Sequence, residues 1–96
     1  MIWTEYDPTW IANAVRATYP EETELLQDIL TCTSCIVKNE KYTYFVDATN
    51  SNRPGSKWQL LQSIKILKTA CGPVVLDVLK GKKLGGVEFL GAVLKD

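Results

Sequence analysis

The sequence predicts an α+β fold in which helices lie on both faces of a mixed, mostly antiparallel sheet. Two amphipathic segments with helical spacing lie near the N-terminus, and short runs of β-branched and aromatic residues follow them. Turn residues separate these segments. A length of 96 residues is enough for a single small domain, residues 1–96. The predicted order of elements is β-α-α-β-β-α-β-(α)-β.

The N-terminal part is predicted to contain one strand and two helices. Residues 1–5 are expected to form a short first strand. A helix is expected to begin at Asp7-Pro8 and run to about Thr18, because Asp is a favoured N-cap and Pro is favoured at the first helical position. Pro20 is expected to start a second helix, whose first turns hold glutamates that suit the helix dipole.

A β-hairpin is predicted next, with strands at residues 35–38 and 41–48 around a turn at Asn39-Glu40. Alternation in the second strand places two sets of side chains on opposite faces. One set is Tyr42, Tyr44 and Val46, and the other is Thr43, Phe45 and Asp47. Because both faces carry aromatic residues, this strand is expected to be central in the sheet.

A polar loop at residues 50–56 leads into a predicted helix of about 14 residues that starts at Lys57. Helical spacing of apolar residues predicts it, and Cys71-Gly72-Pro73 is expected to end it. Residues 74–79 are expected to form a buried strand. Residues 81–90 are either a weak helix or the return strand of a hairpin turning at residues 80–83. In the first case residues 91–94 form the last strand.

This strand, loop and helix predict an anion site. Unpaired backbone N–H groups and the positive end of a helix dipole both favour an anion at a helix N-terminus. The loop residues are also what any exposed turn needs, so an ordinary connection is the alternative.

The loop sequence Asn52-Arg53-Pro54-Gly55-Ser56-Lys57, together with the predicted order of elements, resembles the GNAT family of N-acetyltransferases. The family motif is Gln/Arg-x-x-Gly-x-Gly/Ala, and its backbone amides hold the pyrophosphate of acetyl-coenzyme A. Gly55 matches the first glycine, whereas Asn52 replaces Gln/Arg and Lys57 replaces the second small residue. The resemblance implies that Asn52, Arg53, Gly55, Ser56 and Lys57 bind acetyl-CoA, at the mouth of a cleft between parallel strands at 41–48 and 74–79.

The resemblance also implies candidate catalytic residues. Asp47 lies near the place of a family glutamate and is the candidate base, and Tyr44, with Tyr42, is a candidate acid. Leu90 stands where the family often has a catalytic tyrosine. A catalytically degenerate member is therefore an alternative, in which Asp47 caps a strand and the tyrosines pack on the sheet.

Composition disfavours several other functions. Eleven basic and eleven acidic residues give zero net charge, which disfavours non-specific nucleic-acid binding. No apolar run approaches the roughly 20 residues of a transmembrane helix, and the N-terminus lacks a signal-peptide pattern, so a cytoplasmic location is expected. Cys32-x-x-Cys35 lacks the further ligands of a structural zinc site, since the chain has no histidine, and buried cysteines are expected instead.

Two functions from different classes follow. The first is an acetyl-CoA-binding N-acetyltransferase-like protein, active or degenerate, whose substrate is an amine-bearing small molecule or protein. The second is a small non-enzymatic protein-binding module or inhibitor, for example phage-encoded. The sequence leaves the oligomeric state open.

Overall fold

The computed structural model describes residues 2–47 and 58–91. Its elements are β1 (Thr4–Glu5), α1 (Thr9–Thr18), α2 (Thr23–Ile29), β2 (Ser34–Asn39), β3 (Tyr42–Tyr44), β4 (Leu60–Ile66), β5 (Val74–Leu79) and β6 (Lys83–Phe89). The strands form one six-stranded sheet in the order β1-β2-β3-β6-β5-β4, and every neighbouring pair is antiparallel. The predicted α+β class is confirmed.

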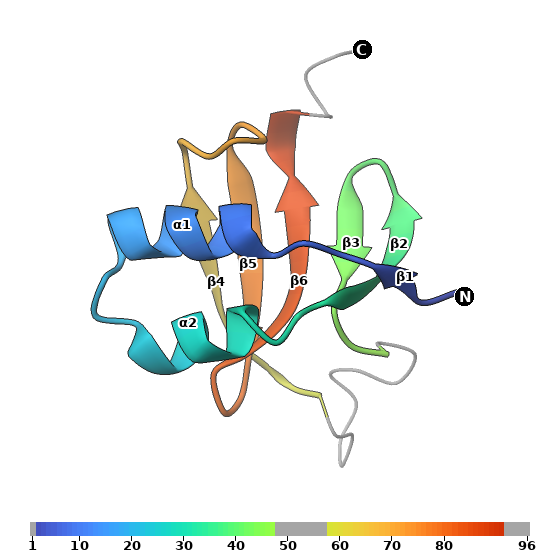
Figure 1. Cartoon of the computed structure of the whole chain (residues 1–96), viewed down its shortest axis with the longest axis horizontal. Coiled ribbons are helices and arrows are strands. Elements are labelled where there is room, and N and C mark those ends of the chain that lie inside the picture. The colour runs from blue at the N-terminus through green and yellow to red at the C-terminus, as the bar shows by residue number, and fades with distance from the viewer. Residues whose placement is uncertain (1, 48–57, 92–96) are drawn as a thin grey trace.

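Both described helices lie across the same face of the sheet (Figure 1), so the prediction of helices on both faces is wrong for the described residues. The predicted cleft between parallel strands at 41–48 and 74–79 is also wrong. Strand β6 lies between β3 and β5 and is hydrogen-bonded to both of them. Strand β6 therefore occupies the space that the acetyltransferase-like order would leave open between these two strands.

The main core lies between the helices and the sheet. Helix α1 contributes Ile11, Ala12, Ala14 and Val15, and α2 contributes Leu25 and Ile29. The sheet contributes alternate residues of its last three strands, which are Ile64, Ile66, Val74, Leu76, Val78, Leu84 and Val87. Because strand residues alternate between faces, the residues between these point to the face that the helices leave uncovered.

The predicted helices at the N-terminus are confirmed, with shifted starts. Asp7 accepts hydrogen bonds through Oδ1 from the Thr9 backbone N–H at 3.0 Å and from the Thr9 hydroxyl at 2.6 Å. Asp7 therefore satisfies an N-terminal donor as a capping residue does, although the helix starts one residue later than predicted. Helix α2 starts at Thr23, after a turn that contains Pro20.

The predicted hairpin around Asn39-Glu40 is confirmed, but its second strand, predicted over residues 41–48, is shorter, since β3 ends at Tyr44 and residues 45–47 are not in a strand. Asn39 Oδ1 accepts hydrogen bonds from the backbone N–H groups of Lys41 at 2.8 Å and Tyr42 at 3.0 Å, which fixes the turn. Strand β3 pairs with β2 on one side and β6 on the other, so it is central, as its two aromatic-bearing faces predicted.

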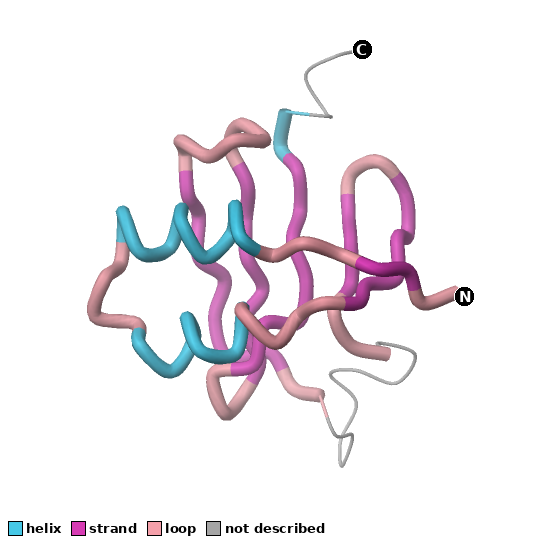
Figure 2. The backbone as a smooth tube through the Cα atoms, in the orientation of Figure 1, coloured by secondary structure: helices cyan, strands magenta, loops and turns pink. Residues whose placement is uncertain are grey.

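The helix predicted from Lys57 is wrong, because residues 60–66 form strand β4 (Figure 2). Within β4, Ile64 and Ile66 are buried whereas Ser63 and Lys65 are not, which is the alternation of a strand. A bulge in its pairing with β5, between Leu60 and Gln62, inserts one residue into this alternation. With Leu61 as the extra residue, Leu61 and Ile64 are three positions apart, which is also the spacing of apolar residues in a helix.

The choice for residues 81–90 is settled in favour of a hairpin strand, since β6 returns antiparallel to β5. Gly81 and Lys82 have positive φ values of 84° and 62°, which tight β-hairpin turns favour. Gly72, with φ 80°, lies in the connection between β4 and β5, so the predicted helix C-cap is a turn between strands.

Polar contacts fasten α2 to the start of β6. Asp28 Oδ2 accepts a hydrogen bond from the Leu84 backbone N–H at 2.8 Å and lies 3.3 Å from Lys83 Nζ. Lys82 Nζ lies 2.9 Å from Glu22 Oε1. Two lysines of the basic turn at residues 80–83 are therefore paired within the chain.

Candidate functional site

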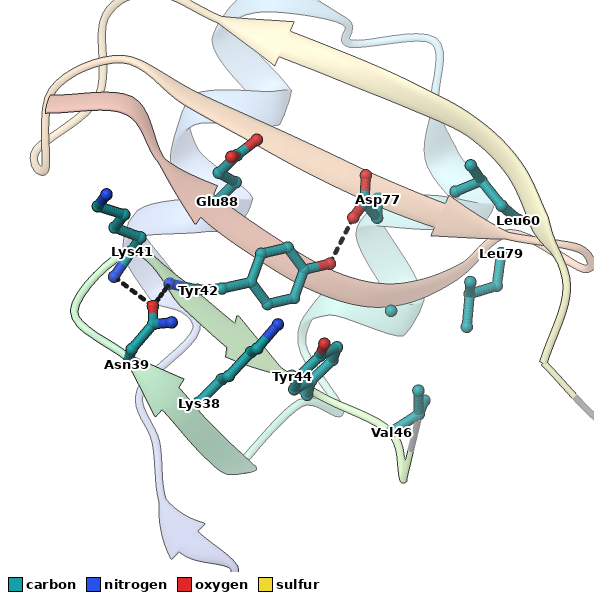
Figure 3. A pocket seen from close by; sticks show the side chains of 11 residues that line it. Lys38, Asn39, Lys41, Tyr42, Tyr44, Val46, Leu60, Asp77, Leu79 and Glu88 are labelled. Carbon is teal, nitrogen blue, oxygen red and sulfur yellow. Dashed lines mark hydrogen bonds between the residues drawn. The ribbon is translucent and has the colours of Figure 1, made fainter. Parts of the chain in front are cut away.

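The face of the sheet opposite the helices carries a hollow of about 410 Å³ (Figure 3). Strands β2 and β3 provide one wall of this hollow, and β4 and β5 provide the other. Its lining residues are Lys38, Asn39, Lys41, Tyr42, Tyr44, Val46, Leu60, Asp77, Leu79, Gly85 and Glu88. This volume falls in the range of small-ligand pockets, roughly 300–1,000 Å³.

Two adjacent glycines in β6 shape the floor of the hollow by allowing side chains of the flanking strands to lie close to the sheet. Gly86 lies opposite Tyr44 on β3 and Asp77 on β5, on the face that the helices do not cover. Gly85 is the residue skipped where the register between β5 and β6 shifts. Neither glycine raises a side chain above β6, so the side chains of Tyr42 and Leu79 lie directly over Gly86 and Gly85.

Gly86 also allows a close approach by Tyr42. A Cβ atom on Gly86 would lie only 2.5 Å from the Tyr42 hydroxyl oxygen and 2.6 Å from its ring. Contacts this short do not occur between real atoms, so any larger residue would displace the Tyr42 ring. Gly86 thus permits Tyr42 to lie flat across β6.

Tyr42 reaches over β6 to a carboxylate on β5. Its hydroxyl donates a short hydrogen bond to Asp77 Oδ2, and the Ser63 hydroxyl on β4 donates to Asp77 Oδ1 at 2.9 Å. Three strands are therefore connected by one network of Tyr42, Asp77 and Ser63. Burial raises the pKa of Tyr42 well above its usual range, and the hydrogen bond and the negative charge of Asp77 raise it further.

Tyr44 and Lys38 complete the wall formed by β2 and β3. The Tyr42 and Tyr44 ring centroids are 4.6 Å apart at an interplanar angle of 53°. Figure 3 shows Lys38 extending its side chain alongside the two rings. Across the hollow, Leu60 and Leu79 face these aromatic groups. The site therefore combines aromatic and aliphatic side chains with four charged ones, Lys38, Lys41, Asp77 and Glu88.

The structure brings together only part of the site predicted from the sequence. Tyr44 lines the hollow, as does Tyr42. Asp47 is exposed beyond the end of β3 and is not among the described lining residues. The five residues of the predicted acetyl-CoA loop, Asn52, Arg53, Gly55, Ser56 and Lys57, lie outside the described residues.

The predicted anion site depends on a helix N-terminus directly after the loop, and no helix begins in residues 58–66. The segment that follows is strand β4, which has no macrodipole comparable to that of a helix. Acetyl-CoA binding therefore remains a prediction from the loop sequence alone.

Sequence reasoning did not identify Asp77 and Gly86 as site residues. Asp77 is the one charged residue in the run Val74-Val75-Leu76-Asp77-Val78-Leu79, and an acid in such a run signals a polar partner on one face. In the helix considered for residues 81–90, Gly85-Gly86 would be destabilising. In a strand, paired glycines instead mark a bulge or a close approach by another group.

The cysteines of Cys32-x-x-Cys35 are buried, as predicted. Burial raises the pKa of Cys32 to about 11 and also raises that of Cys35. A reactive cysteine needs a lowered pKa, so these positions favour packing over redox chemistry. In residues 2–47 and 58–91, no three acidic or cysteine side chains gather as metal ligands would.

Neither described helix is long and apolar enough to cross a membrane. No protein-family model matches the chain, and no curated protein or solved structure shows significant similarity to it.

Proposed function

We propose that this chain is a small non-enzymatic binding module. Its binding site is the hollow on the helix-free face of the sheet, which receives an aromatic side chain of a protein partner. The observation that carries the proposal is the pair of tyrosines beside Gly85 and Gly86, where Tyr42 is held in place by Asp77.

The chemistry of the lining favours binding over catalysis. A general acid or base works best with a pKa near the working pH. The pKa of Tyr42 is raised well above its usual range, so it lies far above neutral pH. The Tyr42 hydroxyl also donates its hydrogen bond to Asp77. The hollow places aromatic and aliphatic side chains beside charged groups, and sites that recognise a ligand combine apolar contacts with placed polar groups in this way.

An aromatic side chain matches the walls of the hollow. Tyr42 and Tyr44 offer ring faces and edges on one side, and Leu60 and Leu79 offer apolar contacts on the other. Aromatic pairs contribute about 0.5–1.5 kcal/mol beyond the area they bury. Lys38 adds a cation beside the rings, which an aromatic face attracts.

The test is an NMR titration of the ¹⁵N-labelled chain with N-acetyl-tyrosinamide as a minimal aromatic probe. A free energy of about 4 kcal/mol corresponds to a millimolar Kd, which this method detects. We expect the probe to shift the amide signals of Gly85, Gly86, Tyr42 and Leu79. N-acetyl-glycinamide, which lacks the ring, should leave them unchanged.

Gly86→Ala provides the decisive variant, since its Cβ displaces the Tyr42 ring, which forms part of the wall of the hollow. We expect it to weaken probe binding at least about tenfold, the equivalent of about 1.4 kcal/mol. Gly91→Ala is the matched control, because a Cβ there meets nothing within 4 Å. Equal probe binding by both variants, or shifts confined to the helices, would overturn the proposal.

The acetyltransferase-like function can be separated in the same experiment. Acetyl-CoA added at hundreds of micromolar should leave the spectrum unchanged if the chain is only a module for protein binding. Saturable shifts with acetyl-CoA would support the prediction made from the loop sequence.

A further inference from the structure

Several polar side chains of the hollow gather around Tyr42, near the turn between β2 and β3. Lys41 precedes Tyr42 in the chain, and Glu88 lies opposite it on β6. Asn39 lies opposite Tyr42 on β2, and Lys38 is the residue skipped where the pairing of β2 and β3 is irregular. All of them line the hollow (Figure 3). This end of the hollow therefore places charged and polar groups beside an aromatic ring.

Two of these groups are cations that are available to a ligand. The Nζ atoms of Lys38 and Lys41 form no ion pair within the described part of the chain, where both ion pairs involve other lysines. Both residues are exposed. An anionic group that enters the hollow can therefore bind them without breaking a contact within the chain.

Asn39 adds a neutral donor at the same end. Its Oδ1 accepts the backbone N–H groups of Lys41 and Tyr42, at 2.8 Å and 3.0 Å. These two bonds fix which atom of the side-chain amide is oxygen, so Nδ2 remains as a donor. Figure 3 shows Nδ2 on the side of Lys38. A carboxylate can accept hydrogen bonds from an amide and from ammonium groups alike.

The hollow also contains two carboxylates, and they differ in what they can bind. Both oxygens of Asp77 already accept hydroxyl groups, from Tyr42 and from Ser63. The Glu88 side chain makes no hydrogen bond or ion pair with the described residues. Two available cations therefore face one available carboxylate, a set that complements an anion with an N–H donor beside it.

The C-terminal residue of a protein carries this combination of groups. Its α-carboxylate is an anion, and its backbone N–H is a donor attached to the same Cα atom. If the residue is aromatic, its ring is joined to that Cα through Cβ alone. One such residue can place its ring against Tyr42 and Tyr44 and its carboxylate at the lysines. A hollow of about 410 Å³ lies near the lower end of the range for small-ligand pockets, which suits a single terminal residue.

We propose that the aromatic residue received by the hollow is the C-terminal residue of the partner, and that its α-carboxylate binds Lys38 and Lys41. Asn39 donates a further hydrogen bond to this carboxylate, and Glu88 accepts the backbone N–H of the same residue. The inference rests on the proposed binding function and adds which part of the partner is recognised. An N-terminal aromatic residue fits less well, because its ammonium group would face two lysines.

Three probes compared by NMR titration of the wild-type chain test the inference. N-acetyl-tyrosine has the free carboxylate of a C-terminal residue, N-acetyl-tyrosinamide replaces it with a neutral amide, and N-acetyl-glycine keeps the carboxylate but lacks the ring. We expect N-acetyl-tyrosine to bind about fivefold tighter than N-acetyl-tyrosinamide, the equivalent of about 1 kcal/mol. N-acetyl-glycine should leave the signals of the hollow unchanged. Added salt should reduce the preference for N-acetyl-tyrosine, because it screens exposed charges.

Charge variants make the result specific to the hollow. In Lys38→Gln/Lys41→Gln the two tyrosine probes should bind equally, and in Lys38→Glu/Lys41→Glu N-acetyl-tyrosinamide should bind tighter. Lys68→Gln/Lys80→Gln is the matched control, because it also removes two exposed lysines but neither of them lines the hollow. This control should keep the preference of the wild type.

Two further probes test whether the carboxylate belongs to a chain end. Tyrosinamide has the free ammonium group of an N-terminal residue, and acetyl-aspartyl-tyrosinamide has its carboxylate on a neighbouring side chain. We expect both to bind more weakly than N-acetyl-tyrosine. Tighter binding by either of them would overturn the inference.

The outcomes separate this inference from the proposed function. Equal binding of N-acetyl-tyrosine and N-acetyl-tyrosinamide to the wild type, or an unchanged preference in Lys38→Gln/Lys41→Gln, would overturn the recognition of a C-terminus. The hollow would still stand as a site for aromatic side chains. If neither tyrosine probe binds, the proposed function fails and this inference fails with it.

Discussion

Tyr42 depends on Gly86 for its space and on Asp77 for its hydrogen-bond partner. The carboxylate also receives the Ser63 hydroxyl, so its two oxygens are bonded from opposite sides of β5. A hydrogen bond to a charged acceptor contributes about 1.5–3 kcal/mol when buried, and less where solvent competes. The network therefore fixes one wall of the hollow before any ligand arrives.

Replacing Tyr42 with Phe tests this network through its pH dependence. The variant loses the hydroxyl that bonds Asp77, and we expect it to be destabilised by about 1–2 kcal/mol at neutral pH, since the site is half-buried. Urea unfolding of both proteins from pH 7 to pH 11 gives the free energies of unfolding.

The sign of the pH effect follows from the raised pKa of Tyr42. Below the ordinary tyrosine pKa of about 10, the hydroxyl is protonated in both states and the difference between the two proteins stays constant. Above it, the unfolded chain releases the proton first, so the stability advantage of the wild type falls by up to about 1.4 kcal/mol per pH unit. A constant difference up to pH 11 would contradict the network.

The sequence predicted which face of the strand carries Tyr42 and Tyr44, but it did not predict that Asp77 and Gly86 contact Tyr42. Alternation alone placed Tyr42 and Tyr44 on one face of a central strand, because side chains of a strand alternate strictly. Asp77 and Gly86 are 35 and 44 positions beyond Tyr42 in the sequence. Only the pairing of β3, β6 and β5 brings them to it, and that pairing depends on non-local register.

Individual helices and strands could be predicted wherever the apolar residues followed one spacing throughout, either helical or alternating. Helix α1 and the β2–β3 hairpin followed from uninterrupted spacing and clear turn residues. Strand β4 was mistaken for a helix because its bulge breaks the alternation at Leu61, and the remaining apolar spacing also fits a helix. Gly72-Pro73 did not resolve this, since glycine and proline end helices and form turns between strands alike.

The polar contact between α2 and β6 gives a testable prediction about how these elements are held together. Asp28→Ala removes the acceptor of the Leu84 N–H and the partner of Lys83, so we expect a loss of about 1.5–3 kcal/mol in the free energy of unfolding. Asp28→Asn keeps an acceptor but loses the charge, and it should cost less than half as much. Equal losses for both variants, measured by urea unfolding, would show that the charge rather than the acceptor matters.

The whole molecule has two layers, with both described helices on one face of an antiparallel sheet and the hollow on the other (Figure 1). Antiparallel sheets often leave one face without a covering layer. Here that face holds two tyrosines, two leucines and four charged residues, together with Gly85. The α+β class could be predicted because some segments of the chain space their apolar residues as helices do and others alternate them as strands do. The uncovered face could not, because it depends on replacing one predicted helix with β4.

This architecture predicts where the backbone is most protected. Strands β5 and β6 lie inside the sheet and beneath the helices, so their amides should exchange with solvent most slowly. Amides of the edge strands β1 and β4 should exchange faster. Native-state hydrogen exchange measures this order, and slowest exchange in β4 would be inconsistent with its position at an edge.

The central claim is that the hollow lined by Tyr42, Tyr44, Leu79 and Gly85 is the binding site of this chain. Intermolecular nuclear Overhauser effects between N-acetyl-tyrosinamide and the isotope-labelled chain test it most directly. The ring protons of the probe should give contacts to Tyr42, Tyr44 and the Leu79 methyl groups, all of which line the hollow. Contacts to α1 or α2 instead, with none to these three residues, would contradict it.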